Sequence, residues 1–272
     1  MNNITELKHI ARSLRKEILT MSYAAKKAHI SSCLSIVDIL TYLYWKEMKI
    51  KPKNPNWQKR DKFILSKGHA APALFAALAY RGFFPEKLLG NYGKNDSNMG
   101  MHPESGLVPG IEISTGALGH GLSIGAGMAL AEKINKTKTR VFVLISDAEC
   151  DEGTTWEAIL FAPQHKLNNL FLLVDYNKLQ AFGTIEEVLN LEPLKDKFAS
   201  FGWNVFDVNG HDFKKIDTMF KKIKHLKSDK PNVIILNTIA GKGISFMENK
   251  LDWHYWNLDE KLYKRALEEL KS

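Results

Sequence analysis

The spacing of hydrophobic positions changes along the chain, and this spacing predicts which segments are helices and which are strands. Between Thr5 and Ala28 apolar residues recur every three to four positions, which predicts an amphipathic helix, and segment 34–48 predicts a second helix. The run 140–146 is continuously apolar and rich in β-branched residues, as expected of a strand buried on both faces. Further strands are predicted at 169–177, 202–208 and 232–239.

Helical patterns lie between these strands. An Ala-rich helix is expected to follow a short strand and a glycine turn within 63–83, and further helices are predicted at 122–134, 154–167 and 213–226. The long segment 90–121 is rich in Gly, Asn and Ser and predicts a loop. Strands that alternate with helices predict an α/β fold, in which a mainly parallel sheet has helices on both faces. We expect a single domain over residues 1–272, because no repeat or linker interrupts the pattern.

Two polar residues end two of the apolar runs. Asp147 follows the run 140–146, and Asn177 ends the next predicted strand, 177 − 147 = 30 positions later. Ligands of open parallel sheets bind at the carboxyl ends of the strands, so we expect both side chains at the same edge of the sheet. Their oxygens suit Mg²⁺ or Ca²⁺, and Mg²⁺ held by few protein groups completes its shell with phosphate oxygens and water. The pattern therefore indicates a ligand that carries a diphosphate.

Other interpretations of these residues stay open at this point. Taken alone, Asp147 also suits a cap of the following turn, and Asn177 also suits a tight turn. The glycines between Gly116 and Gly127 are superficially similar to a dinucleotide fingerprint. No convincing buried strand precedes them and the acidic residue of that fingerprint is missing, so we do not expect NAD binding.

Composition narrows the class of protein further. The 272 residues are 44% hydrophobic, as in a packed globular protein, and show neither a transmembrane span nor a signal peptide. The net charge of +8 (38 basic minus 30 acidic residues) comes from scattered lysines, so we expect neither nucleic acid nor a membrane as a partner. The only cysteines, Cys33 and Cys150, are too few for a disulfide framework and favour a cytoplasmic protein.

Several motifs in one order resemble those of a known family. The segment around Asp147 is similar to the thiamine diphosphate signature of transketolases, usually written Gly-Asp-Gly, an acidic residue with glycine, Trp-Glu-Ala and Asp-x-Asn. In this chain the four parts read Ser146-Asp147-Ala148, Glu152-Gly153, Trp156-Glu157-Ala158 and Asp175-Tyr176-Asn177. Further matches are FILSKGHAAPAL, GMHPE, STGALGHGLSIGAGMALAEK and TIAGKGISFME. The resemblance spans about Ile10 to His254 and is greatest to the separately encoded N-terminal halves of split transketolases.

This resemblance implies a set of cofactor-binding residues. Asp147 and the Asn177 side chain correspond to the metal ligands, with the Leu179 carbonyl oxygen as a third. The backbone of Gly116 and Leu118 corresponds to the segment that holds the aminopyrimidine ring of thiamine diphosphate.

The resemblance also assigns the remaining site residues. The Ala148 N–H corresponds to a phosphate donor, and Glu152 corresponds to an acid that links the two cofactor sites of the family. The histidines that correspond to those around the diphosphate, the thiazolium carbon and the sugar are His29, His69, His102 and His254. The implied roles of these four are catalytic, and His69 also belongs to the cofactor site.

The chain departs from the family pattern at three places. Residues 146–148 read Ser-Asp-Ala in place of Gly-Asp-Gly, and residues 29–33 read His-Ile-Ser-Ser-Cys in place of His-Pro-Gly-Ala-Pro. Tyr255 and Trp256 replace the common Gly-Lys. The last two changes lie where the family binds its sugar, so a sugar other than an ordinary pentose phosphate remains an alternative.

The family's catalytic glutamate belongs to a pyrimidine domain that has no counterpart in this sequence. The resemblance therefore implies a partner, a C-terminal transketolase subunit of roughly 300 residues that carries this domain and its glutamate. Twofold pairing of such units would give a heterotetramer.

The expected activity is transfer of a two-carbon ketol unit from a ketose or ketose phosphate to an aldose, with thiamine diphosphate and Mg²⁺ or Ca²⁺ as cofactors. Two alternatives are a specialised thiamine-dependent carboligase in sugar or secondary-metabolite biosynthesis, and a non-catalytic scaffold subunit.

Overall fold

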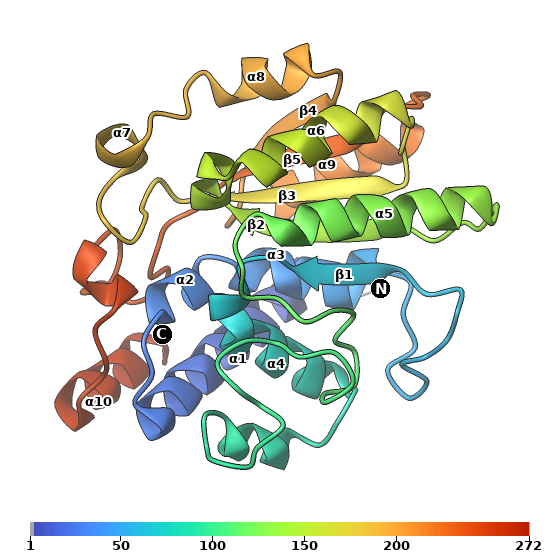
Figure 1. Cartoon of the computed structure of the whole chain (residues 1–272). Coiled ribbons are helices and arrows are strands. Elements are labelled where there is room, and N and C mark those ends of the chain that lie inside the picture. The colour runs from blue at the N-terminus through green and yellow to red at the C-terminus, as the bar shows by residue number, and fades with distance from the viewer. Residues whose placement is uncertain (1–2, 272) are drawn as a thin grey trace.

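The computed structural model describes residues 3–271, and its centre is a five-stranded parallel sheet with helices on both sides (Figure 1). The strands lie in the order β1-β2-β3-β5-β4, and every neighbouring pair is parallel. Their bounds are β1 Lys62–Leu65, β2 Val141–Ser146, β3 Leu170–Tyr176, β4 Asn204–Asn209 and β5 Asn232–Asn237. The expected α/β fold with a parallel sheet is confirmed.

Ten α-helices and several shorter helical turns connect the strands within the described residues. The α-helices are α1 Ile4–Ala25, α2 Ile30–Leu34, α3 Val37–Tyr42, α4 Ala71–Arg81, α5 His120–Ile134, α6 Gly153–Gln164, α7 Ile185–Val188, α8 Leu194–Ser200, α9 Phe213–His225 and α10 Glu260–Glu269. The 3₁₀ turns are Gly68–Ala70, Glu86–Asn91, Asp147–Asp151 and Leu251–His254, and a π turn covers Leu43–Glu47.

The sheet separates two apolar cores, and successive residues of the central strands alternate between them. In β2, Phe142 and Leu144 belong to the core that also contains α1, α3, α4 and α9, whereas Val143 and Ile145 belong to the core under α5, α6 and α8. Because successive side chains of a strand point to opposite faces, a continuously apolar strand is what a sheet covered on both sides requires. The three layers hold the carboxyl ends of the strands in fixed positions.

Two of the expected helices are shorter than their hydrophobic pattern indicates. The first helix ends at Ala25 instead of Ala28, because Lys26 adopts the left-handed conformation (φ 51°) and its N–H bonds to the carbonyls of the last turn. Segment 34–48 is not one helix but the end of α2, then α3 and the π turn. Over so few residues, α- and π-helical turns space their apolar positions alike. The apolar pattern therefore does not show where α2 ends or where α3 passes into the π turn.

Segment 90–121 is largely the expected loop, and it runs between α4 and α5 (Figure 1). In the figure the arrow of β1 points to the side of the molecule where α2 and α7 lie, and this side carries the carboxyl ends of all five strands. Within residues 3–271 no helix is both long and apolar enough to cross a membrane.

Candidate active site

Asp147 and Asn177 occupy the carboxyl tips of two neighbouring strands. β2 ends at Ser146, and its register with β3 places Ser146 beside Asp175, two residues before Asn177. A left-handed turn at Lys178 (φ 65°) brings the Lys178 N–H within 2.6 Å of Asp147 Oδ2. The expected adjacency of the two tips is confirmed, and the Asp147 carboxylate faces the turn that carries Asn177.

The Asp147 carboxylate is fully buried, and none of the cationic side chains in residues 3–271 is in contact with it. Burial, followed by repulsion from Asp175, raises the pKa of Asp147 to about 7, although the N–H groups of Lys178 and Ala148 donate to it. A bound cation would favour the ionised form of such a group. In the described part of the chain no cluster of three or more His, Cys, Asp or Glu is arranged to hold a metal, so a cation here would depend on mixed oxygen donors.

The Asn177 amide is oriented by hydrogen bonds at both of its ends. Its Nδ2 donates to Asp175 Oδ2 at 3.0 Å, and its Oδ1 accepts the Leu179 N–H at 2.9 Å. The Leu179 carbonyl oxygen accepts no hydrogen bond from the described residues. The strand tips therefore gather a carboxylate, an amide oxygen and an unused carbonyl oxygen, which is the donor chemistry that Mg²⁺ and Ca²⁺ prefer.

A buried ion pair lies behind the Asn177 amide. Lys67 and Asp175 are both inaccessible to solvent, and Lys67 Nζ lies 2.6 Å from Asp175 Oδ2. Ser35 Oγ donates to the same oxygen at 2.7 Å, and Thr238 Oγ1 donates to Oδ1 at 2.5 Å. Burial would raise the pKa of Asp175, but the Lys67 ammonium and these donors outweigh it and hold the pKa below its usual value. The carboxylate is therefore ionised, and it fixes Asn177 from behind.

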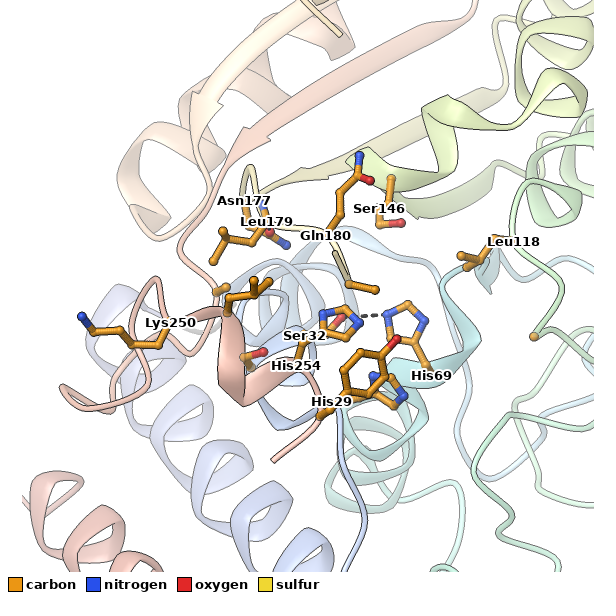
Figure 2. A pocket seen from close by; sticks show the side chains of 17 residues that line it. His29, Ser32, His69, Leu118, Ser146, Asn177, Leu179, Gln180, Lys250 and His254 are labelled. Atoms are coloured by element: carbon orange, nitrogen blue, oxygen red, sulfur yellow. Dashed lines mark hydrogen bonds between the residues drawn. The ribbon is translucent and has the colours of Figure 1, made fainter. Parts of the chain in front are cut away.

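A cavity of about 230 Å³ opens beside these strand tips (Figure 2). The residues expected at the site that line it are His29, His69, Gly116, Leu118, Ala148, Asn177, Leu179 and His254. Ser31, Ser32, Gln180 and Tyr255 also belong to its wall. In Figure 2 the labelled histidines gather on one side, and Asn177 and Leu179 lie on the other.

Three of the expected histidines form one cluster. The ring centroid of His29 lies 5.0 Å from that of His69 and 5.1 Å from that of His254. Burial, followed by the charges of neighbouring residues that include Lys67, lowers the pKa of all three, to about 4 for His254. All three imidazoles are therefore neutral at pH 7. His29 itself has a left-handed backbone (φ 67°), a conformation that costs free energy for a residue with a Cβ and that is enriched at functional sites.

His102 and Glu152 lie outside the cavity wall. The His102 ring packs against Gly116, whose φ of 155° and lack of a side chain leave room for it: an added Cβ would come within 3.3 Å of the ring. Glu152 is exposed and contacts Gly119 at the start of α5. His102 and Glu152 thus lie beside the cavity without lining it. Asp147 does not line it either, although its chain neighbours Ser146 and Ala148 do.

The two departures from Gly-Asp-Gly need no glycine conformation. Ser146 has φ −84° and ψ 162°, and Ala148 is not among the residues with positive φ. The Ala148 N–H, for which the resemblance implied a phosphate contact, donates to Asp147 Oδ1 at 2.9 Å in this structure. Backbone strain at these two positions is therefore no obstacle to a bound anion.

A buried glutamate holds the tip of β2 to the start of α5. Glu149 Oε2 accepts the Ser146 N–H at 2.9 Å, and the Ser146 hydroxyl accepts the Glu149 N–H at 3.3 Å, which is a capping box. Glu149 Oε1 accepts the Gly119 N–H at 2.9 Å and also the hydroxyl of Ser66. Ser146 thus acquires a structural role that the usual glycine cannot have.

Four residues at the site were not expected from the sequence: Lys67, Asp175, Glu149 and Ser32. One signal was present, because Asp175 is an acidic residue inside an otherwise apolar strand, and a buried charge of this kind requires a partner. The partner, Lys67, is 108 positions away along the chain and had no signal of its own.

Comparison with known proteins agrees with this geometry. Residues 8–270 match the family described as transketolase, thiamine diphosphate binding domain. The chain is 41% identical to the 6-deoxy-6-sulfo-D-fructose transketolase subunit of Clostridium sp. (strain MSTE9), over 98% of this chain and 96% of that protein. It is 40% identical to an apulose-4-phosphate transketolase subunit of Phocaeicola vulgatus, over 94% of this chain and 90% of that protein.

Full-length transketolases match over only part of their length. The structure of transketolase from Campylobacter jejuni superposes with a TM-score of 0.93 and 32% identity, over 99% of this chain and 43% of that one. The family and the thiamine diphosphate-binding fold expected from the motifs are therefore confirmed, and with them the class of transferases. The chain belongs to the transketolase family, whose thiamine diphosphate-binding domain it matches over residues 8–270.

Proposed function

We propose that this chain is the thiamine diphosphate-binding subunit of a two-chain transketolase, which transfers a two-carbon ketol unit from a ketose or ketose phosphate to an aldose. One observation carries the proposal: the paired strand tips of Asp147 and Asn177 lie at a cavity whose opposite side is formed by three neutral histidines. One end of this site suits a metal-bound diphosphate, and the other suits proton transfer to and from a sugar.

The residues present fit the cofactor and its metal. Asp147, the Asn177 Oδ1 and the Leu179 carbonyl would hold Mg²⁺, although the same oxygens also accept Ca²⁺. Backbone of Gly116 and Leu118 on the cavity wall would support the aminopyrimidine ring. Bound thiamine diphosphate supplies stabilisation of the carbanion that forms when the C–C bond of the ketose breaks.

The chain's own groups would orient the sugar and move its protons. Neutral His29, His69 and His254 each have one ring nitrogen that donates and one that accepts, so each is competent to bind a hydroxyl or to pass a proton near pH 7. His102, packed against Gly116, lies at the edge of this group. The burial of the cluster limits competition from water.

We further propose that a second chain completes the site. This chain spans almost the whole length of two relatives named as transketolase subunits but only 43% of the Campylobacter jejuni enzyme. A single pyrophosphate-binding domain over 1–272 would then leave the pyrimidine domain and its glutamate to a C-terminal subunit. Glu152, exposed beside Gly119, would face that assembly. We expect two pairs to form a heterotetramer in the cytoplasm.

A specific observation favours a specialised sugar over an ordinary pentose phosphate. Tyr255 packs its ring 5.5 Å from that of His29 and 4.9 Å from that of His254, at the position where the family commonly has glycine. This ring narrows the sugar side of the cavity. Two relatives are named for unusual sugars, 6-deoxy-6-sulfo-D-fructose and apulose 4-phosphate, and this chain would share that type of specialisation.

The proposal is tested by co-expressing the chain with the product of a neighbouring gene that encodes a transketolase C-terminal half. Ketol transfer is measured for the pair and for each chain alone, with thiamine diphosphate and Mg²⁺. We compare xylulose 5-phosphate plus ribose 5-phosphate with the sugars of the two named relatives. Turnover by the pair only supports the proposal. Turnover by this chain alone, or none by the pair with any donor, contradicts it.

A further inference from the structure

Ser32 makes a contact that the family's usual residue cannot make. Its hydroxyl oxygen lies 2.9 Å from Nε2 of His69, and both residues line the cavity (Figure 2). The resemblance gives alanine as the common residue at this position, and alanine has no side-chain donor or acceptor. The hydrogen bond is therefore a feature of this chain and of relatives that share the serine.

The backbone around this contact is held firmly. Lys67 Nζ donates to the Ser32 carbonyl at 3.0 Å while it pairs with Asp175. Lys67 is also only two residues before His69 in the chain. One buried cation thus fixes the backbone of Ser32 and the turn that carries His69, so their side chains meet in a determined geometry.

The other hydrogen-bond partners available to Ser32 and His69 indicate which of the two donates. Among residues 3–271 the Ser32 hydroxyl has no second partner, and Ser32 is 6% exposed. If His69 donated through Nε2–H, the buried hydroxyl hydrogen of Ser32 would have no protein acceptor, which is costly. If Ser32 donates, its hydroxyl hydrogen has an acceptor, and the proton of the neutral imidazole lies on Nδ1, which is not among the fully buried side-chain atoms without a partner in the described residues.

We propose that Ser32 is a positioning residue, whose hydroxyl donates to Nε2 of His69 and holds this imidazole as the tautomer with its proton on Nδ1. His69 then presents a neutral N–H donor, through Nδ1, to an anionic or hydroxyl oxygen of the bound ligand. The effect of this arrangement on turnover rests on the proposed function, whereas the tautomer itself is a property of the chain alone.

The tautomer is measured by two-bond ¹H–¹⁵N correlation spectra of the full chain, labelled at its nine histidines. The signal of His69 is assigned from its absence in His69→Gln. We expect the Nδ1–H tautomer in the wild type and in Ser32→Thr, which keeps the hydroxyl. In Ser32→Ala we expect a shift to the Nε2–H tautomer or to a mixture. Ser31→Ala, which removes a hydroxyl that donates to the Trp253 carbonyl, serves as the matched control and leaves the His69 signal unchanged.

Turnover of the assembled two-chain enzyme gives the second readout. We expect kcat of Ser32→Ala to fall about five- to tenfold, the effect of one lost hydrogen bond, and Ser32→Thr to recover most of it. An Nε2–H tautomer in the wild type, or an unchanged His69 tautomer in a folded Ser32→Ala protein, overturns the proposal. The spectra need no cofactor, so a failure to bind thiamine diphosphate would contradict the proposed function and leave this measurement intact.

Discussion

Replacing Lys67 by methionine removes the cation of the buried pair and keeps a side chain of similar length. The Lys67 Nζ to Asp175 Oδ2 distance of 2.6 Å corresponds to about 6 kcal/mol of attraction at an effective dielectric constant of about 20. Desolvation of both groups offsets much of this attraction in the intact pair, but removal of one partner leaves an uncompensated buried charge. We therefore expect Lys67→Met to lower the free energy of unfolding by about 3–5 kcal/mol.

The assay is urea unfolding followed by circular dichroism at pH 7, with three further variants: Lys166→Met, Asp175→Asn and the double variant Lys67→Met/Asp175→Asn. Lys166→Met breaks the exposed pair with Asp229, whose side chains are 65% and 59% exposed, and should cost at most about 1 kcal/mol. Lys67→Met/Asp175→Asn carries neither charge, so its loss should be smaller than the sum of the single losses by about 2 kcal/mol. A loss in Lys67→Met no larger than in Lys166→Met would refute the electrostatic reasoning.

Three other predictions concern Glu149, the ion pair of Arg15 with Asp38, and Tyr255 on the cavity wall. Glu149→Gln places an NH₂ group against the N–H of Ser146 or Gly119, so urea titration should show a loss of about 1–3 kcal/mol, and an unchanged midpoint would count against these bonds. Burial would raise the pKa of Asp38, but Arg15 and a hydrogen bond from His211 lower it from 3.8 to about 2. The stabilisation is thus complete above about pH 4 and is lost as pH falls toward 2. The difference in free energy of unfolding between wild type and Asp38→Asn should therefore narrow over that range. A difference that does not depend on pH would contradict this role of Asp38. Tyr255→Gly should raise kcat/KM for xylulose 5-phosphate relative to the preferred sugar by about tenfold, and equal changes for both sugars would exclude Tyr255 from selectivity.

The adjacency of Asp147 and Asn177 was predictable because it depends on local pattern and on sheet topology. A strand buried on both faces has a mainly apolar run, and the polar residues that end the run mark its carboxyl end. Asp147 and Asn177 each end such a run, and consecutive strands with one intervening helix are neighbours in the observed order. The two residues therefore share one edge of the sheet in the structure.

The supports of the site were not predictable from the same pattern. Lys67 lies in a Ser-Lys-Gly-His segment that suits an exposed turn, and only the fold brings it to Asp175 across 108 positions. Ser32 lies between the helices expected at 5–28 and 34–48, and its bond to His69 depends on α2, which follows a left-handed residue, His29. Hydrophobic periodicity contains no information on such contacts, because they arise between side chains of different layers.

The most direct test of the account is calorimetric titration of thiamine diphosphate with Mg²⁺ into the assembled two-chain protein. We expect saturable binding that depends on the metal and is weakened at least tenfold in Asp147→Asn and in Asn177→Ala. Asn237→Ala, which removes an exposed amide at the tip of β5, should bind as the wild type does. Absence of binding in the wild type, or equal affinity in Asp147→Asn and Asn177→Ala, would contradict the assignment of these two strand tips as the anchor of the cofactor.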